Sequence, residues 1–315
     1  MNLCIIAPMK EGLYMNFEKL YEDYLIYIEY RLKEQSKNTL KERFKNKILP
    51  FFKDYNIEDI DENVYLKWQN EIEIFNYSNS YKCNLHYLMT NFYEYLKKYH
   101  GIEKNVPRNV GNFKLRNELK EYHVYSNKEF KHFVRYVKND IYKQFFNLMF
   151  YTGLRPGEAM ALKFSDLNDK ILSINKTIDE HKGRTINSPK TKTSIRKIEI
   201  DRKLNKDLLN LKKYYIKKYN KIDDYYIFGG IKPLSPTTIN RYKKNACVKA
   251  NLKPIKLHEF RHSHATLLVS KKLMIKEVSR RLGHSNTNIT LNTYTHTKKE
   301  YEKRVVRTLN FMRLF

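Results

Sequence analysis

The periodic pattern of apolar residues is interrupted between Glu103 and Arg116, and this interruption divides the chain into two regions. The run EKNVPRNVGNFKLR contains proline, glycine and asparagine and has no helical periodicity, which is typical of a linker between domains. A chain of 315 residues is long enough for two domains that each have a core. We therefore expect an N-terminal extension at 1–15, a first domain at 16–102, a linker at 103–120, a second domain at 121–296 and a C-terminal tail at 297–315.

The first region has the spacing of a small helical bundle. Its first helix is predicted from an apolar face with i, i+3, i+4 and i+7 spacing, formed by Phe17, Leu20, Tyr21, Tyr24, Leu25 and Ile28. Further helices are predicted from near Thr39 to around Pro50, roughly from Asp61 to Phe75, and from Ser78 to Tyr99. Four helices with short connections predict a four-helix bundle.

The second region is predicted to be mainly helical with a small sheet inserted. Ser126 and Glu129 have the spacing of a capping box, which predicts that a helix begins there. After Leu167 the runs ILSINKTI, TINSPK and IRKIEI, separated by polar turns, predict three short antiparallel strands. Helices return from Leu204 onward. The expected fold class is therefore mainly α, with a three-stranded antiparallel sheet in the second domain.

The net charge indicates the class of binding partner, and the cysteine content indicates the cellular compartment. The chain has 61 Lys and Arg against 34 Asp and Glu, a net charge of +27, so a polyanion such as double-stranded DNA is the expected partner. The codon bias of an AT-rich genome explains part of the lysine count but not this excess of base over acid. Cys4, Cys83 and Cys247 lie far apart, which predicts a reducing cytoplasm and no zinc module. The sequence contains no run of about 18 apolar residues, so no membrane-spanning segment is predicted.

Six side chains in the second half have the chemistry to open and close a phosphodiester. Two guanidiniums, two imidazoles, an ammonium and a phenol can hold a phosphate, attack it and protonate its leaving oxygen. They are Arg155 in TGLRPGEAMAL, Lys190 in SPKTKTSIRKIEI, His258 and Arg261 in LHEFRHSHATLL, His284 in LGHSNTNIT and Tyr294 in LNTYTH.

Local sequence explains how several of these residues could face a phosphate. Gly153 is suited to end one helix and Pro156 to begin the next, so Arg155 lies at a helix junction. His258 and Arg261 are three residues apart, and on a helix they share a face. Each position also has a purely structural interpretation, because arginines pair with neighbouring carboxylates and most of the 26 tyrosines are expected to be packing groups. Arg155 could pair with Glu158, Lys192 competes with Lys190, and Tyr301 is the rival of Tyr294.

The second half of the chain resembles the tyrosine recombinases, the phage-integrase family. The resemblance lies in the order of its sequence blocks: TGLR-x-x-E, then HEFRH, then LGHS, then a tyrosine ten residues later. The resemblance covers roughly residues 121–296, and the helices at 16–102 are similar to the SAM-like core-binding domain of that family. It implies a catalytic domain of the DNA breaking-rejoining type. It also implies a catalytic set of Arg155, Lys190, His258, Arg261, His284 and Tyr294, with Glu158 as a support.

The resemblance further implies a mechanism without metal or other cofactor. Tyr294 would attack the scissile phosphate and form a 3′-phosphotyrosine, the arginines and histidines would stabilise the charge on phosphorus, and Lys190 would protonate the 5′ oxygen. The sequence has no GxxxxGK[ST] loop. The resemblance also implies three kinds of partner. These are double-stranded DNA carrying attachment sites, further copies of the chain in a homotetramer on a Holliday junction, and accessory DNA-bending proteins.

Two other functions would use part of the same chemistry. A type IB topoisomerase-like enzyme would relax DNA as a monomer, and a catalytically silent relative would bind DNA only. The LGHS block and the apolar tail, with Val305, Leu309 and Phe311 among its residues, favour the recombinase. Only about 15 residues precede the first predicted helix, too few for a separate arm-site-binding domain.

Overall fold

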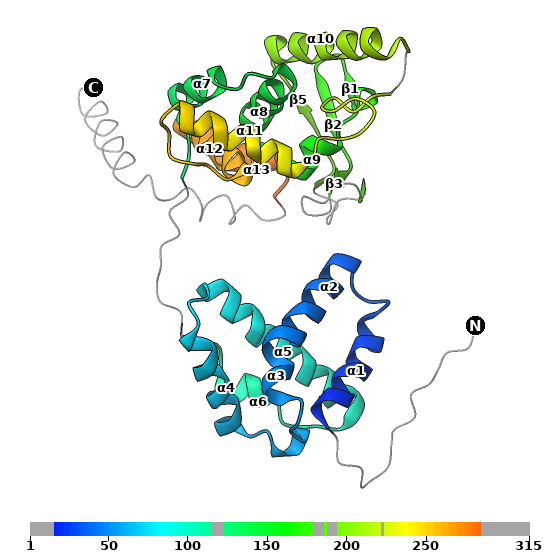
Figure 1. The fold of residues 1–315 in the computed structure, drawn as a ribbon, viewed down its shortest axis with the longest axis vertical. Coiled ribbons are helices and arrows are strands. Elements are labelled where there is room, and N and C mark those ends of the chain that lie inside the picture. Colours follow the sequence, from blue (N-terminus) through cyan, green and yellow to red (C-terminus); the bar gives the residue numbers. More distant parts are fainter. Residues whose placement is uncertain (1–15, 115–122, 179–185, 188–193, 222–223, 285–315) are drawn as a thin grey trace, which may run out of the picture. The chain divides into compact units, whose positions relative to one another are not determined.

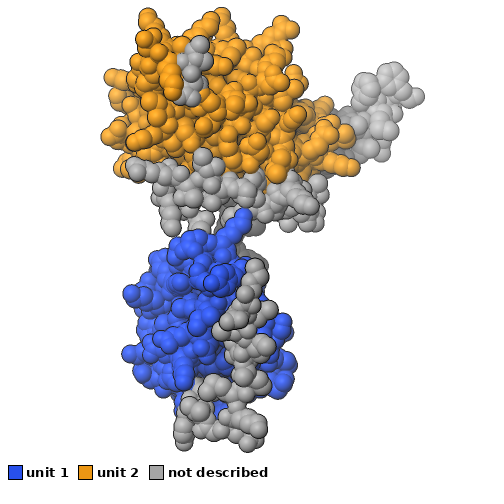
Figure 2. Space-filling model, turned by 90° about the vertical axis from the view of Figure 1, so that its right-hand side faces the viewer, with its two compact units in different colours: residues 1–120 blue, residues 121–315 orange. Residues whose placement is uncertain are grey.

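The computed structural model describes residues 16–114, 123–178, 186–187, 194–221 and 224–284. The chain forms two compact units, residues 1–120 and residues 121–315, which are coloured separately in Figure 2. Each unit has its own hydrophobic core. The domain boundaries expected from the sequence remain predictions.

The first unit consists of helices (Figure 1), and several of them begin at a residue whose side chain caps the first turn. Asn16 caps α1, Asp61 caps α4 and Ser78 caps α5, each through hydrogen bonds from backbone N–H groups of the first turn. Gly101 ends α5 in the left-handed conformation. The helices are α1 (Phe17–Ile28), α2 (Glu34–Arg43), α3 (Leu49–Phe52), α4 (Glu62–Ile74), α5 (Asn79–His100) and α6 (Val106–Val110), with a 3₁₀ turn at Ile57–Asp59.

The second predicted helix has different bounds in the structure. It was expected from Thr39 to Pro50, but α2 begins at Glu34 and the helical run continues to Phe52. Between α2 and α3 the segment Phe44–Ile48 is a π-helix, in which the N–H of Leu49 donates to the carbonyl of Phe44. Pro50 therefore lies in the first turn of α3, where its missing N–H leaves no hydrogen bond broken, so the proline does not end the run.

Aromatic rings fill the core of the first unit. Phe17, Phe44, Phe52 and Phe92 are fully buried, and the Phe17 ring lies 5.1 Å from that of Phe92, centroid to centroid. Trp68 joins the same cluster, and its indole N–H donates to the carbonyl of Lys47 at 2.9 Å.

The non-periodic run after Glu103 is partly ordered against this core. It contains the single helical turn α6, and the side chains of Val106 and Phe113 are buried in the first unit. Gln69 on α4 donates to the carbonyl of Gly111 at 3.0 Å. One turn is too short to produce a detectable helical period, which explains why the sequence pattern indicated only a linker.

The second unit is built on α8, which contacts α7, α9, α10 and α12. The capping box predicted for Ser126 and Glu129 is present at the start of α7. In Figure 1, α11, α12 and α13 lie at one side of this unit and the strands at the other. Among the described residues of the chain, no helix is long and apolar enough to cross a membrane. The helices are α7 (Asn127–Arg135), α8 (Asp140–Thr152), α9 (Pro156–Ala161), α10 (Arg202–Tyr219), α11 (Pro236–Lys249), α12 (Leu257–Ser270) and α13 (Ile275–Leu282).

The predicted three-stranded antiparallel sheet is confirmed, although its strands are distributed differently. Its order is β1 (Leu167–Asn168), β2 (Ile171–Ile174) and β5 (Arg196–Glu199). The run ILSINKTI is divided, because its second half forms β3 (Thr177–Ile178), which pairs with β4 (Ile186–Asn187) in a separate ladder. Helix α9 packs on β3 so closely that a Cβ atom on Gly157 would lie 2.3 Å from the carbonyl oxygen of Ile178.

Candidate active site

Four of the six predicted site residues lie in the described part of the chain, and the structure brings them together. Arg155 precedes α9, His258 and Arg261 lie in the first turns of α12, and His284 follows the end of α13. Lys190 and Tyr294 lie outside the described residues, as do their rivals Lys192 and Tyr301. The charges of Arg155 and Arg261 act on both His258 and His284, which makes the four side chains one cluster.

Arg155 occupies the predicted helix junction. Gly153 ends α8 with φ +68°, and Pro156 begins α9. The Arg155 guanidinium donates to the Glu158 carboxylate at 2.8 Å and to the carbonyl of Gly283 at 3.4 Å. Its side chain is 35% exposed, so one part is fixed by these contacts while another reaches the surface.

Arg261 is fixed much more completely than Arg155. It is only 2% exposed, and its guanidinium donates to the carbonyl of Gly153 at 2.8 Å and to that of Leu282 at 2.7 Å. These carbonyls belong to the ends of α8 and α13, where the partial negative charge of a helix favours a cation. Arg261 therefore joins the helix end beside Arg155 to the helix end beside His284.

The two predicted histidines are neutral in the DNA-free protein. Burial, followed by the neighbouring His262 and the positive charges of Arg261 and Arg155, lowers the pKa of His258 to about 4. Burial and the same two arginines lower the pKa of His284 to about 3. A neutral imidazole can accept a proton or donate its one N–H. A phosphodiester bound between the arginines would raise both pKa values, because its negative charge favours the imidazolium form.

Glu158 holds two arginines at once. Its carboxylate accepts from the backbone N–H of Arg155 at 3.0 Å and from the Arg196 guanidinium at 3.1 and 2.9 Å. Burial raises the pKa of the Glu158 carboxyl, but the hydrogen bonds and charges of Arg196 and Arg155 outweigh burial and keep it below its ordinary value. The ion pair weighed for Arg155 therefore exists, and it is part of a larger network.

Three residues of this network were not predicted from the sequence. Arg281 donates from Nε to His264 Nε2 at 3.3 Å, so the His264 proton lies on Nδ1 and is donated to the carbonyl of Phe150 at 2.9 Å. Arg196 donates from Nε to the carbonyl of Arg281 at 2.9 Å. Strand alternation offered a signal for Arg196, because this residue shares the inner face of β5 with the buried Ile198. No comparable local signal exists for Arg281 or His264.

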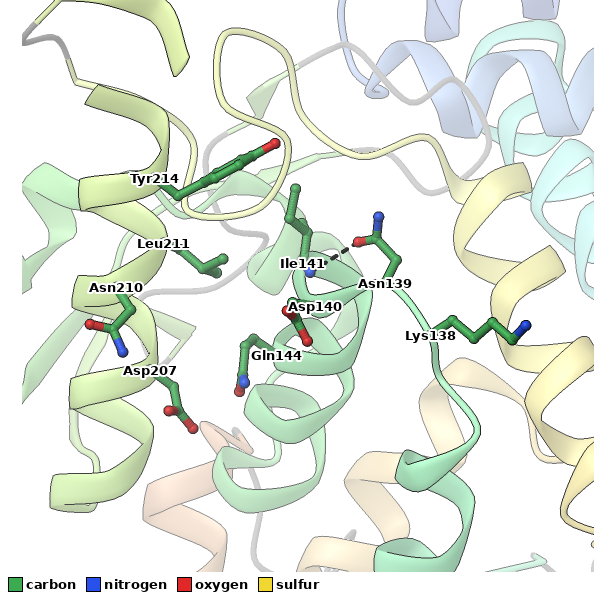
Figure 3. A pocket seen from close by; sticks show the side chains of 9 residues that line it. All are labelled: Lys138, Asn139, Asp140, Ile141, Gln144, Asp207, Asn210, Leu211 and Tyr214. Carbon is green, nitrogen blue, oxygen red and sulfur yellow. Dashed lines mark hydrogen bonds between the residues drawn. The ribbon is translucent and has the colours of Figure 1, made fainter. Parts of the chain in front are cut away.

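A cavity of about 580 Å³ lies elsewhere in the second unit, between the start of α8 and α10. Figure 3 shows the carboxylates of Asp140 and Asp207 and the carboxamides of Gln144 and Asn210 lining it. None of the four site residues that the structure describes contributes to its wall. Two carboxylates would repel a phosphodiester, so this cavity is no substitute for the arginine and histidine cluster.

Comparison with known proteins bears on the family and the fold. Residues 125–301 match the model of the phage integrase family, and residues 16–72 match the N-terminal SAM-like domain of phage integrases. The ICEBs1 integrase of Bacillus subtilis is 35% identical over 197 residues, which cover 58% of this chain and 52% of that protein. The chain spans about half the length of this and two further curated relatives.

Solved structures share the fold. The Tn1549 transposon integrase in complex with transposon right end DNA has a TM-score of 0.72 and 16% identity, over 93% of this chain and 100% of that one. A lambda integrase tetramer bound to a Holliday junction has a TM-score of 0.70 and 18% identity, over 89% of this chain and 77% of that one. Because the family model covers more than half of the chain, the protein belongs to the phage integrase family, the tyrosine recombinases.

Proposed function

We propose that this chain is the site-specific recombinase, or integrase, of a phage or other mobile element, and that it cleaves and rejoins duplex DNA through a 3′-phosphotyrosine. The observation that carries the proposal is the cluster of two guanidiniums and two neutral imidazoles. It lies where the ends of α8 and α13 meet the start of α12. Family membership and a net charge of +27 support it.

Each site residue has a role that its chemistry allows. The Tyr294 oxygen attacks the scissile phosphorus, the bond from phosphorus to the 5′ oxygen breaks, and a 3′-phosphotyrosine and a 5′-hydroxyl result. Arg155 and Arg261 stabilise the charge on the phosphoryl oxygens, because fixed donors need no reorganisation during the reaction.

Protons move through the remaining groups. His258 and His284, neutral before DNA binds, donate hydrogen bonds to the phosphate or accept the phenol proton. Lys190, or Lys192 in its place, supplies the proton to the departing 5′ oxygen. The phosphotyrosine bond keeps the energy of the broken phosphodiester, and rejoining runs the same steps in reverse.

The assembly is part of the same proposal. We infer that residues 16–102 and 121–296 form core-binding and catalytic domains on duplex attachment sites, and that four chains exchange strands through a Holliday junction. The lambda integrase tetramer on such a junction, which shares this fold, supports that arrangement. Accessory DNA-bending proteins would assist it, and residues 297–315 would serve as the tail that packs on the same or a neighbouring chain.

A nicked duplex that traps the covalent intermediate tests the proposal directly. The duplex carries the end sequence of the element that encodes this chain, and products are separated on a denaturing gel. We expect a protein–DNA adduct with the wild type and with Tyr301→Phe, and none with Tyr294→Phe, while all three bind DNA equally. An adduct that persists in Tyr294→Phe would refute the assigned nucleophile. Intact DNA binding without any wild-type adduct would instead indicate a catalytically silent relative.

A further inference from the structure

Glu158 carries one negative charge between two arginines. Its Oε1 accepts from Nη1 of Arg155 at 2.8 Å and from Nη1 of Arg196 at 3.1 Å. Its Oε2 accepts from the backbone N–H of Arg155 at 3.0 Å and from Nη2 of Arg196 at 2.9 Å. Each carboxylate oxygen is therefore shared by the two arginines. Because one carboxylate neutralises only one guanidinium, these three side chains together keep one positive charge.

The two arginines differ in how accessible that charge is. The side chain of Arg196 is 8% exposed and that of Glu158 is 5% exposed, whereas that of Arg155 is 35% exposed. Nε of Arg196 also donates to the carbonyl of Arg281 at 2.9 Å, while the corresponding contact of Arg155, to the carbonyl of Gly283, is longer at 3.4 Å. Arg196 is thus the buried, fixed partner of the carboxylate, and Arg155 is the arginine that a phosphate can reach.

Electrostatics assigns the carboxylate to Arg196 in the same way. Burial raises the pKa of the Glu158 carboxyl, and among the groups that lower it again Arg196 has a greater effect than Arg155. Without Arg196, the buried carboxylate would keep Arg155 as its cationic partner. A phosphate would then compete with Glu158 for that guanidinium, because carboxylates and phosphates bind arginine with the same forked geometry. The competing carboxylate is already 2.8 Å away.

The backbone of Arg196 is held independently of its side chain. Arg196 pairs with Ile174 in the ladder between β2 and β5, and Ser194 and Ile198, two residues to either side, are buried. Changes to the guanidinium are therefore expected to leave β5 in place. Lys197 on the same strand is exposed, so Lys197→Gln removes one positive charge without touching the Glu158 network.

We propose that Arg196 is a positioning residue that acts through Glu158: it pairs with the buried carboxylate and so leaves the charge of Arg155 available for the scissile phosphate. This inference rests on the proposed function. It concerns charge more than shape, so Arg196→Lys should preserve the effect and Arg196→Gln should lose it. It also predicts a rescue, because removing the charge of Glu158 as well removes the anion that competes with the phosphate.

The test measures adduct formation by the full-length chain on the nicked duplex, in a single turnover at saturating DNA, so that binding does not limit the rate. We expect Arg196→Gln to slow adduct formation about 100-fold, as the loss of a fixed donor to a developing oxyanion does. Arg196→Lys and Lys197→Gln should stay close to the wild-type rate. The double variant Glu158→Gln, Arg196→Gln should be at least about 10-fold faster than Arg196→Gln alone.

The rates are compared at a temperature at which circular dichroism shows every variant folded, so that a rescued rate does not reflect rescued folding. Arg196→Met is the second neutral variant if Arg196→Gln does not fold. A double variant no faster than the single one, a wild-type rate in Arg196→Gln, or an Arg196→Lys as slow as Arg196→Gln would each overturn this inference alone. A wild-type chain that binds the duplex and forms no adduct would overturn the proposed function instead.

Discussion

The two units stabilise their interiors in different ways. In the first unit the buried lysines Lys37 and Lys82 pair with glutamates that are half exposed, so the charged ends meet at the edge of an aromatic core. In the second unit, Glu158 and Arg196 are both buried, together with Arg261 and His264. Burying a charge is unfavourable unless it is fully paired. The comparison teaches that the second unit buries both members of its central ion pair, whereas the first unit keeps one member of each pair half exposed.

The largest expected effect is the loss of an aromatic ring from the first core. Phe92→Ala removes a fully buried ring that lies 5.3 Å from Tyr24 and 5.8 Å from Phe44, centroid to centroid. We expect a loss of about 4 kcal/mol in the free energy of unfolding. Trp68 is the one tryptophan of the chain, so urea unfolding followed by its fluorescence reports on the first unit.

Tyr87→Ala on the same helix is the matched control, because that ring is exposed and its loss should change stability by less than about 0.5 kcal/mol. An unchanged Trp68 transition in Phe92→Ala would show that aromatic packing is not what holds the first unit together.

The second prediction removes the charge at the centre of the second unit. Glu158→Gln keeps the shape of the side chain but leaves Arg155 and Arg196 without their shared carboxylate. We expect a loss of about 3 kcal/mol, because a buried charge loses its partner. Circular dichroism during urea unfolding should show this shift, while the Trp68 transition stays in place. Glu277→Gln, an exposed change on α13, is the control. A shift in the Trp68 transition would contradict the independence of the two interiors.

Local sequence signals predicted those parts of the molecule that depend on neighbours along the chain. The junction of Gly153, Arg155 and Pro156 follows from turn and cap chemistry, and the His258 and Arg261 pair follows from helical spacing. The second helix begins at Glu34, earlier than the predicted Thr39, and continues two residues past Pro50, because a proline in the first turn of a helix leaves no hydrogen bond broken.

The supports of the candidate site could not be predicted in the same way. Arg196 contacts Glu158, which is 38 residues away, and Arg281, which is 85 residues away. His264 contacts Phe150 across 114 residues. Such contacts exist only once β5 has packed with α9 and α13, and α12 with α8, so the periodicity of the sequence does not reveal them. The positions of Lys190 and Tyr294 remain predictions from sequence.

The third prediction compares two glycines with the same backbone but different surroundings. Gly153 and Gly101 both have positive φ, +68° and +73°, so alanine is strained at either position. A Cβ atom on Gly153 would lie 2.6 Å from the His264 ring and 2.7 Å from Leu282, whereas nothing lies within 4 Å of one on Gly101. We expect Gly101→Ala to lose about 1 kcal/mol and Gly153→Ala about 2 kcal/mol.

The same urea experiments separate the two glycines. The Gly101→Ala effect should appear in the Trp68 transition, and the Gly153→Ala effect in the circular dichroism of the second unit together with slower adduct formation. Equal losses in the two variants would show that the space beside Gly153 adapts and that only backbone strain matters.

The last prediction concerns the pH dependence of the second unit. Burial and the charge of Arg281 lower the pKa of His264 to about 3, whereas an unfolded chain has a histidine pKa near 6.5. Between these values the unfolded state binds a proton that the native state does not. Stability is therefore complete above about pH 6.5, falls as the pH decreases, and levels off near pH 3.

His264→Asn removes this proton while its amide can still donate to the carbonyl of Phe150. The slope of unfolding free energy against pH between 6 and 5 should then decrease by up to about 1.4 kcal/mol per pH unit relative to the wild type. The exposed His132 on α7 supplies the control, and His132→Asn should leave the slope unchanged. The Trp68 transition should keep its own pH dependence in both variants. A wild-type slope in His264→Asn would mean that this histidine is already protonated in the native network, and that Arg281 does not donate to it.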